Sequence, residues 1–224
     1  MTLIDDLPVG WMSFAIPGAP AMSDEYATYV MYPGDRRPEV PALARDWRWL
    51  RDGPVFEEST MVVGDVEPTT ELSIEALTAL VPDGLPADLV SFAAEPVLRS
   101  RLGSGTSCYF DLGDRLEEVP GGRLLHLISD QQWCLHWSVF LGDDGTSAVV
   151  AGDYPAGFEL DDEDREVYGD LPVVRVRCAD DVTEFFWRWW NDNLVARAHW
   201  HDEPLTARQR EYVAGYGRPV ALED

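Results

Sequence analysis

The chain of 224 residues carries 41 acidic and 17 basic side chains, which give a formal net charge of −24 and a pI near 4.3. Such a charge repels phosphate backbones and anionic lipid headgroups. It therefore argues against nucleic acid or a membrane surface as a direct partner and favours a basic protein. The same acidity would also suit a protein that needs it only for solubility. With 46% hydrophobic residues, the chain can bury a full core and lacks the composition of a disordered protein.

No apolar run reaches the roughly 18 to 20 residues of a membrane-spanning helix. The N-terminal sequence MTLIDDLPVGW lacks the basic and apolar regions of a signal peptide. The three cysteines, Cys108, Cys134 and Cys178, form no CxxC pair, so reduced core residues are expected rather than a disulfide or zinc framework. We therefore expect a cytoplasmic protein without a cofactor or metal.

Residues 1–66 predict a small mixed region. Strands are expected over residues 11–16 and 25–32, each followed by a Pro-Gly pair. Residues 41–53 are expected to form a short helix, because an early proline, apolar residues three and four apart and a final glycine are typical helix signals. Its arginines at positions 45, 48 and 51 are expected to pair with neighbouring carboxylates rather than to bind an anion.

Two further helices are expected before the main sheet. In residues 73–81 apolar side chains recur at helical spacing, with Thr70 or Ser73 as candidate N-caps. In residues 85–96, Pro86 suits the first turn of a helix with an apolar stripe. A turn-rich segment then leads to a short apolar strand at residues 108–112.

The stretch from His126 to Asp153 is the centre of the predicted fold. Alternate positions are apolar, at Trp133, Leu135, Trp137, Val139 and Leu141. The positions between them carry Cys134, His136, Ser138 and Phe140. This period of two places one set of side chains on each face of a β-strand. A turn at residues 143–145, a returning strand over 146–151 and a further strand at 124–128 complete an antiparallel meander, which needs a helix packed on it.

After the meander, residues 157–172 concentrate acidic side chains around the run DDED. A half-exposed strand is expected over residues 173–178. The next helix is capped by Asp180 or Asp181 and runs to about Arg197, and its broad apolar face covers the sheet. That face consists of Val182, Phe185, Phe186, Trp189, Trp190 and Leu194.

A short final helix is expected over residues 206–216. This order predicts an α+β fold, an antiparallel sheet meander flanked by helices, with an extra N-terminal α/β segment. We divide it into an N-terminal extension packed on the core (1–66), the α+β domain (67–200) and a C-terminal helical tail (201–224).

Candidate reaction centres fail on their residue types or spacing. The segment GSGTS at 103–107 lacks the pattern of a nucleophile elbow, and no Walker loop is possible because the chain contains no lysine. The DDED run lacks the glycine and final glutamate of a calcium loop. His199 and His201 form only a weak metal motif at a helix end, and His126 and His136 are expected to be core or half-exposed histidines rather than general bases.

Three groups of core residues resemble motifs of the SUKH superfamily, whose members include bacterial immunity proteins and a fungal regulator of cell-wall synthesis. The similarity covers roughly residues 72–197. An LPxx[YL]xxF helix is matched by Leu85, Pro86, Leu89 and Phe92. A tryptophan-led strand ending in a D-x-G-type turn is matched by Trp137, Val139, Leu141, Asp144 and Gly145. The closing helix is matched by Val182, Phe185 and Phe186, although its Ser-Phe start and the Asn-Gly after the first helix are absent.

The resemblance implies a protein that binds and neutralises a cognate toxin domain by stoichiometric occlusion, without being an enzyme. A basic nuclease toxin would suit the acidic charge of this chain. On this hypothesis the partner contacts come from Asp161, Asp162, Glu163, Asp164 and Glu166, with Trp133 and Tyr154 as aromatic anchors. The alternatives are an intracellular scaffold that binds partners without inhibiting them, and an enzyme that uses the His199 and His201 region.

Overall fold

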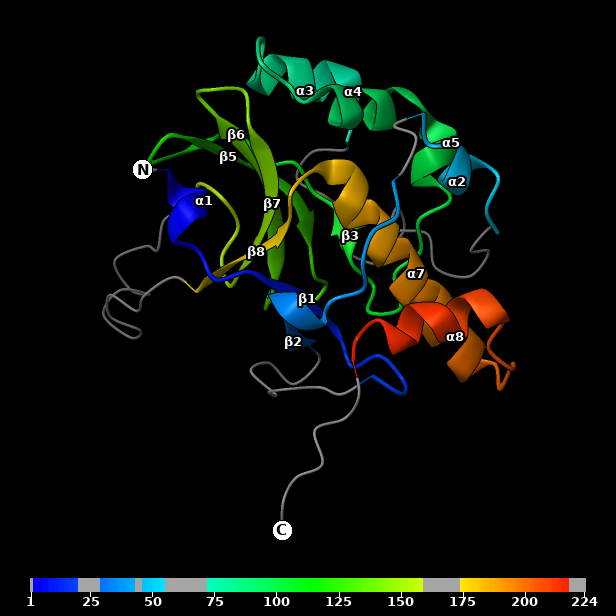
Figure 1. The fold of residues 1–224 in the computed structure, drawn as a ribbon. Helices are drawn as coiled ribbons and strands as arrows, with labels where there is room; N and C mark the ends of the chain where they lie inside the picture. Colours follow the sequence, from blue (N-terminus) through cyan, green and yellow to red (C-terminus); the bar gives the residue numbers. More distant parts are fainter. Residues whose placement is uncertain (1, 20–28, 43–45, 55–71, 159–173, 218–224) are drawn as a thin grey trace.

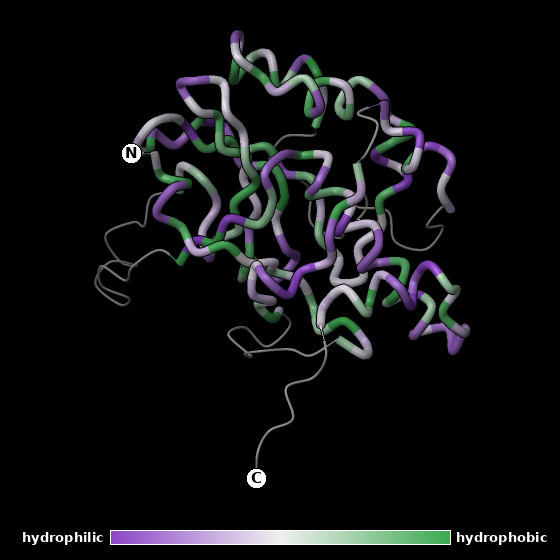
Figure 2. Tube along the Cα trace, in the orientation of Figure 1, coloured by the Kyte–Doolittle hydropathy of each residue, from purple (hydrophilic) through white to green (hydrophobic). Residues whose placement is uncertain are grey.

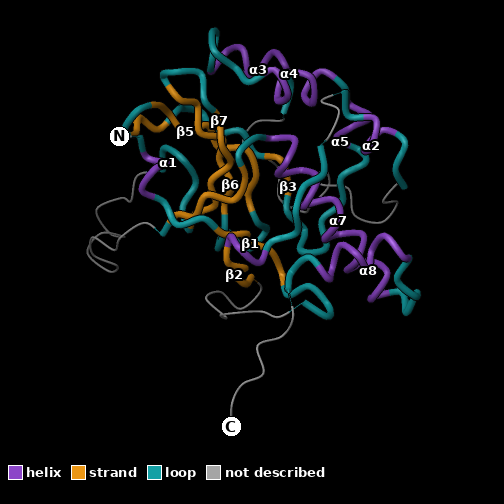
Figure 3. Tube along the Cα trace, in the orientation of Figure 1, coloured by secondary structure: helices purple, strands orange, loops and turns teal. Residues whose placement is uncertain are grey.

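The computed structural model describes residues 2–19, 29–42, 46–54, 72–158 and 174–217. Within them, helices flank a six-stranded antiparallel sheet of order β3-β5-β6-β7-β8, in which β4 pairs with β5, and a separate two-stranded sheet joins β1 and β2 (Figures 1 and 3). The strands are β1 Gly10–Phe14, β2 Tyr29–Pro33, β3 Tyr109–Phe110, β4 Glu117–Val119, β5 Gly122–Ser129, β6 His136–Gly142, β7 Ser147–Gly152 and β8 Arg175–Ala179. The helices are α1 Leu3–Asp6, the 3-10 helix Gly34–Arg36, α2 Arg48–Arg51, α3 Ile74–Leu80, α4 Ala87–Ala94, α5 Pro96–Arg99, α7 Val182–Trp200 and α8 Ala207–Ala214. The predicted α+β class is confirmed.

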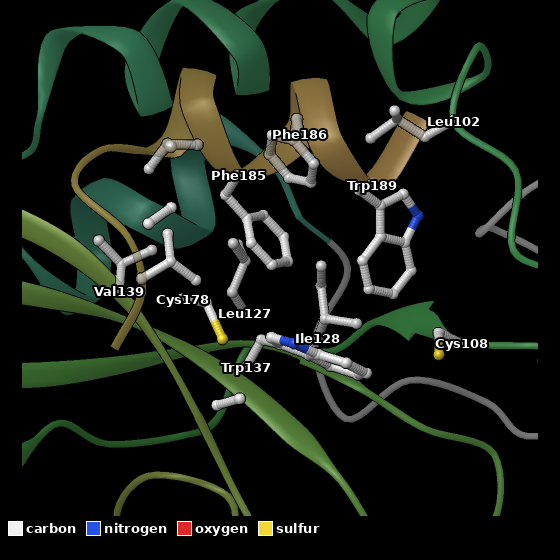
Figure 4. Close-up of a cluster of buried hydrophobic side chains, with 14 of the residues drawn as sticks. Leu102, Cys108, Leu127, Ile128, Trp137, Val139, Cys178, Phe185, Phe186 and Trp189 are labelled. Carbon is white, nitrogen blue, oxygen red and sulfur yellow. The ribbon is translucent and has the colours of Figure 1, made fainter. Parts of the chain in front are cut away.

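Helix α7 packs on one face of the sheet, as the apolar pattern predicted (Figures 1 and 4). Asp181 caps it by accepting a hydrogen bond of 2.7 Å from the backbone N–H of Glu184, and the helix continues to Trp200, beyond its predicted end. Trp189 from α7 meets Trp137 from β6 edge-on, with ring centroids 5.0 Å apart. None of the helices in the described part of the chain, α7 included, is both long enough and apolar enough to cross a membrane.

The N-terminal residues belong to the same hydrophobic core. Strand β1 packs beside β8, where the backbone N–H of Arg177 donates to the carbonyl of Pro8. Trp11 on β1 is fully buried against Phe185 of α7. Residues from β1, β2, α2, α4 and α7 therefore form one apolar cluster, and many of the hydrophobic stretches follow the strands and helices that build it (Figure 2).

The opposite face of the sheet is divided into an apolar end and a polar end. At the apolar end, Ile4 of α1 covers Leu124 and Phe140 in a second, smaller core cluster. At the polar end lie buried side chains of β5 and β6: His126, Ser129, His136 and Ser138. In β5 the register with β6 shifts between His126 and Ile128, which is the mark of a β-bulge.

Two sequence-based boundaries were wrong. Of the helix expected over 41–53, the described residues 41–42 and 46–53 contain only the single turn α2, because Trp47 just before it takes a left-handed backbone with φ of 59° and is buried. Of its arginines, Arg48 pairs with Asp46 and Arg51 with Glu95, as expected. The central strand begins at His136 rather than at Trp133, which lies in the preceding turn with φ of 58°.

Candidate functional site

The turn between β5 and β6 presents Trp133 to solvent. Asp130 organises this turn: its carbonyl accepts from the N–H of Trp133 at 2.9 Å, and its carboxylate accepts from the N–H of Gln132 at 3.0 Å. The left-handed backbone of Trp133 is unfavourable for a residue with a Cβ, and the surrounding hydrogen bonds maintain it. The side chain is nevertheless 47% exposed. The chain therefore stores local strain to hold a large aromatic side chain at the surface.

Two contacts fix the indole ring of Trp133. Its Nε1 donates a hydrogen bond of 2.8 Å to the hydroxyl of Tyr109 on β3. Its ring meets the imidazole of His136 edge-on, with centroids 5.4 Å apart and planes at 81°. An aromatic ring that is already held in place loses little conformational freedom when a partner binds, which suits an anchor residue.

A second aromatic wall comes from the segment that follows β7. Ala156 is buried in the second core cluster, and Gly157 turns the chain with φ of 77°. The next residue, Phe158, is 43% exposed and stacks on Tyr154, with ring centroids 5.5 Å apart and planes 7° apart. The stacked pair gives a flat aromatic surface whose orientation is set by the buried residue before it.

Trp133 and Phe158 line one small pocket with a volume of about 180 Å³. Two largely buried polar side chains, Asp111 and His126, also line it. Asp114 and Arg115 contribute the charged part of its lining. The pocket thus combines exposed aromatic groups, carboxylates and a buried imidazole.

Beneath the pocket, three buried polar side chains converge on the hydroxyl of a fourth. The Oγ of Ser129 lies 2.8 Å from Nε2 of His126, 3.0 Å from Nδ1 of His136 and 3.1 Å from Oδ2 of Asp111. The two imidazole centroids are 5.4 Å apart. The β-bulge explains this arrangement, since residues 126 and 129 would lie on opposite faces of a regular strand.

Proton counting assigns the roles in this cluster. A hydroxyl has one hydrogen and two lone pairs, and a carboxylate can only accept, so Ser129 donates to Asp111 and accepts from Nε2 of His126. His126 then carries its proton on Nε2, which leaves Nδ1 as an acceptor. This buried atom has no hydrogen-bond partner among the described residues. Burial and the neighbouring His126 lower the pKa of His136 to about 4, so this ring is neutral at pH 7.

The cluster around Ser129 does not have the geometry of a catalytic triad. Ser129 is fully buried in a strand, so its hydroxyl is shielded from a substrate. Asp111 accepts a hydrogen bond from this hydroxyl, and its Oδ2 lies 3.7 Å from Nε2 of His126, beyond hydrogen-bond distance. Within the described residues, no group of three or more His, Cys, Asp or Glu side chains has the arrangement of a metal site. His199 and His201 lie exposed at the end of α7.

Two larger hollows, of about 580 and 820 Å³, flank residues 37–41. The arginines that line the first are engaged: Arg188 pairs with Glu184 at 2.6 Å, and Arg37 donates to the carbonyl of Cys178 at 2.7 Å. The lining of neither hollow includes an exposed large hydrophobic side chain. The pocket beside Trp133 is lined by two exposed large hydrophobic side chains, Trp133 and Phe158, and we therefore take it as the candidate site.

The structure brings two of the sequence-predicted contact residues together, because Trp133 lines the pocket and Tyr154 stacks on its other wall. The predicted acidic contacts lie outside the described residues: Asp161, Asp162, Glu163, Asp164 and Glu166. Sequence reasoning missed Phe158, Asp111 and the serine-histidine cluster. The polar positions of the meander, His126, His136 and Ser138, were the available signal, since they interrupt an otherwise apolar pattern.

No family model, curated protein or solved structure matches this chain. The features of this chain that bear on its function are therefore the geometry of the pocket and the net charge of the protein.

Proposed function

We propose that this protein is an immunity protein of SUKH type that binds a basic toxin domain and neutralises it by occlusion. The observation that carries the proposal is the fixed, half-exposed ring of Trp133 beside Phe158, on a protein with a net charge of −24. Exposed large aromatic residues that are held rigidly are typical hot spots of protein interfaces.

The backbone of Trp133 supports a binding role for this turn. A left-handed conformation costs on the order of 1–3 kcal/mol for a residue other than glycine, and such conformations cluster at functional sites. Burial of the indole would offset this cost in a core residue, but Trp133 is 47% exposed. A partner that covers the ring would supply the missing apolar burial.

Charge supports a basic partner. Opposite net charges accelerate diffusional encounter, and this acceleration decreases with ionic strength. The acidic run from Asp161 to Asp164 follows Phe158 closely in the sequence, so an aromatic anchor and a source of negative charge are near one another along the chain. A nuclease toxin must present a basic surface to hold phosphates, and an acidic inhibitor can occlude that surface.

The direct test is binding to the product of the adjacent gene, measured by co-purification and calorimetry, together with growth during expression of that product. We expect a one-to-one complex and protection of growth. A complex without protection would support the scaffold alternative instead. Failure to bind the product and to protect growth would overturn the proposal.

Two variants test the proposed surface. Trp133→Ala should weaken the complex about 30-fold, the equivalent of roughly 2 kcal/mol for an interface hot spot, whereas Trp200→Ala, at an exposed tryptophan at the end of α7, should not. Reversing the charges of residues 161–164 should lower the association rate and its salt dependence. If affinity and salt dependence stay unchanged, the acidic run has no part in binding.

A further inference from the structure

We propose that the pocket between Trp133 and Phe158 is a receptor for one guanidinium group, the side chain of an arginine on the partner. This inference rests on the proposed function and names the chemistry of its contact. It is carried by three features of the same pocket: two exposed aromatic side chains, carboxylates in the lining, and a buried imidazole nitrogen without a partner.

The pocket has room for the head of a side chain. Its volume of about 180 Å³ corresponds to roughly six water molecules at about 30 Å³ each. That space accommodates a planar guanidinium with part of its aliphatic stem, and it is far below the 300–1,000 Å³ typical of pockets for whole small molecules. The size favours a single side chain as the occupant.

The aromatic rings favour a planar cation. A guanidinium within about 6 Å of a tryptophan or phenylalanine ring is attracted to the face of the ring, and the attraction strengthens when the pair is removed from water. This protein already uses the same contact internally. The guanidinium carbon of Arg208 lies 5.5 Å from the ring centre of Trp190, and that of Arg188 lies 5.9 Å from the ring centre of Trp11.

The polar lining supplies acceptors for a cation. Asp111 and Asp114 bring carboxylates to the pocket, and His126 lines it with an imidazole whose buried Nδ1 has no partner among the described residues. A ligand N–H that reached this atom would remove the cost of leaving it unpaired. Arginine suits the site better than lysine, because it offers five donors in one plane and is less strongly hydrated.

An anion is the competing occupant, because Arg115 also lines the pocket. Its side chain runs close to Gly157, where an added Cβ would lie 3.0 Å from its Cγ. Two carboxylates in the lining and the net charge of −24 oppose a bound anion. We therefore assign the pocket to the cation and use an anion as one arm of the test.

The test uses the full chain and the indole N–H signals of its nine tryptophans in a two-dimensional nuclear magnetic resonance spectrum. Trp133→Phe identifies the signal of Trp133. The probes are N-acetyl-arginine amide, its neutral citrulline counterpart, N-acetyl-lysine amide and acetate. We expect arginine to shift the Trp133 signal saturably with a dissociation constant on the order of 1–10 mM, and citrulline to bind at least about tenfold more weakly.

Variants distinguish binding of arginine in the pocket from its attraction by the overall negative charge of the protein. Phe158→Ala and Asp114→Asn should each weaken arginine binding several-fold, whereas Asp143→Asn, the same charge change in the hairpin between β6 and β7, should not. Equal binding of arginine and citrulline, a preference for acetate, or no saturable shift would overturn the inference. If the toxin partner binds but its affinity is unchanged in the Phe158 and Asp114 variants, the inference fails while the proposed function stands.

Discussion

Trp133 and Tyr109 are joined across the edge of the sheet by a hydrogen bond of 2.8 Å from the indole Nε1 to the phenol oxygen. Tyr109 sits on β3 and Trp133 in the turn that follows β5, so the bond ties the exposed turn to the strand that pairs with β5. Burial raises the pKa of Tyr109, so its hydroxyl stays protonated in the neutral range. The hydroxyl therefore serves as a fixed acceptor for the indole.

Tyr109→Phe should loosen the indole of Trp133 without unfolding the protein. Loss of one hydrogen bond costs about 0.5–1.5 kcal/mol, and the phenyl ring keeps its packing. We expect the Trp133 indole N–H signal to shift, its order parameter to fall, and affinity for a bound partner to decrease about two- to tenfold. An unchanged order parameter would mean that the contact with His136 alone holds the ring.

The lowered pKa of His136 predicts that the folded protein becomes less stable in acid. The unfolded chain takes up a proton near pH 6.5, while burial beside His126 keeps His136 neutral in the folded chain until about pH 4. Between these values the unfolded state binds more protons, so stability decreases as pH falls. The groups near the ring are His126, Ser129, Asp111 and the carbonyl of Trp133.

The measurement compares the wild type with His136→Asn, whose amide can hydrogen-bond the hydroxyl of Ser129 but does not titrate. The difference in unfolding free energy between the two proteins should change by about 3 kcal/mol across this pH interval, to the disadvantage of the wild type in acid. Parallel pH curves for the two proteins would contradict the assignment.

Substitution of Asp88 on α4 should strongly destabilise the fold, because this residue acts as a second cap for α7. Its Oδ2 accepts hydrogen bonds from the backbone N–H groups of Val182 and Thr183, at 3.1 and 3.2 Å. Asp88→Ala would leave both N–H groups unpaired in a buried site, and we expect a loss of about 2 kcal/mol in urea unfolding. Ser73→Ala, which removes the less buried cap of α3, should cost about half as much. Equal losses would argue against a special role for Asp88.

Asp192 lies on α7, where this helix meets β1 and α8, and its substitution should also lower the stability of the fold. One carboxylate oxygen accepts from Trp11 and Ser13, and the other accepts from the hydroxyls of Tyr212 and Tyr216, at 2.6–2.8 Å. Burial raises the pKa of this carboxyl, and the four hydrogen bonds oppose the rise. Asp192→Asn replaces one acceptor oxygen with an NH2 donor that faces the donor groups of its partners. The free energy of unfolding should therefore fall by about 1–3 kcal/mol. Asp143→Asn serves as the exposed control, and an equal midpoint for both variants would contradict the prediction.

Local signals were sufficient to predict helices α3 and α7. The caps at Ser73 and Asp181 and the apolar spacing that follows them predicted α3 and α7, since each signal depends on residues within one turn of helix. The prediction of a helix over 41–53 was wrong, because burial of Trp47 against Phe92 and Phe186 stabilises the fold by more than the helical conformation would have contributed.

The candidate site could be predicted only in part. Trp133 and Tyr154 were the predicted aromatic contact residues; Trp133 lines the pocket, and Tyr154 stacks on Phe158, which also lines it. Phe158 gave no separate signal, because its exposure depends on Ala156, which is buried two residues earlier by contacts with strands distant in the sequence. The sequence therefore indicated two aromatic residues beside the pocket but not the pocket itself.

The amino-acid sequence by itself determined the acidity of the protein, the two-faced pattern of β6 and the amphipathic helix that covers one face, because charge and periodicity are local properties of a chain. Only the tertiary structure decided that Ser129 joins His126 beneath Trp133. Strict alternation places residues three apart on opposite faces of a strand, and the bulge between His126 and Ile128 moves Ser129 to the same face. The energy that holds a bulge comes from packing against neighbouring strands, which no short stretch of sequence contains.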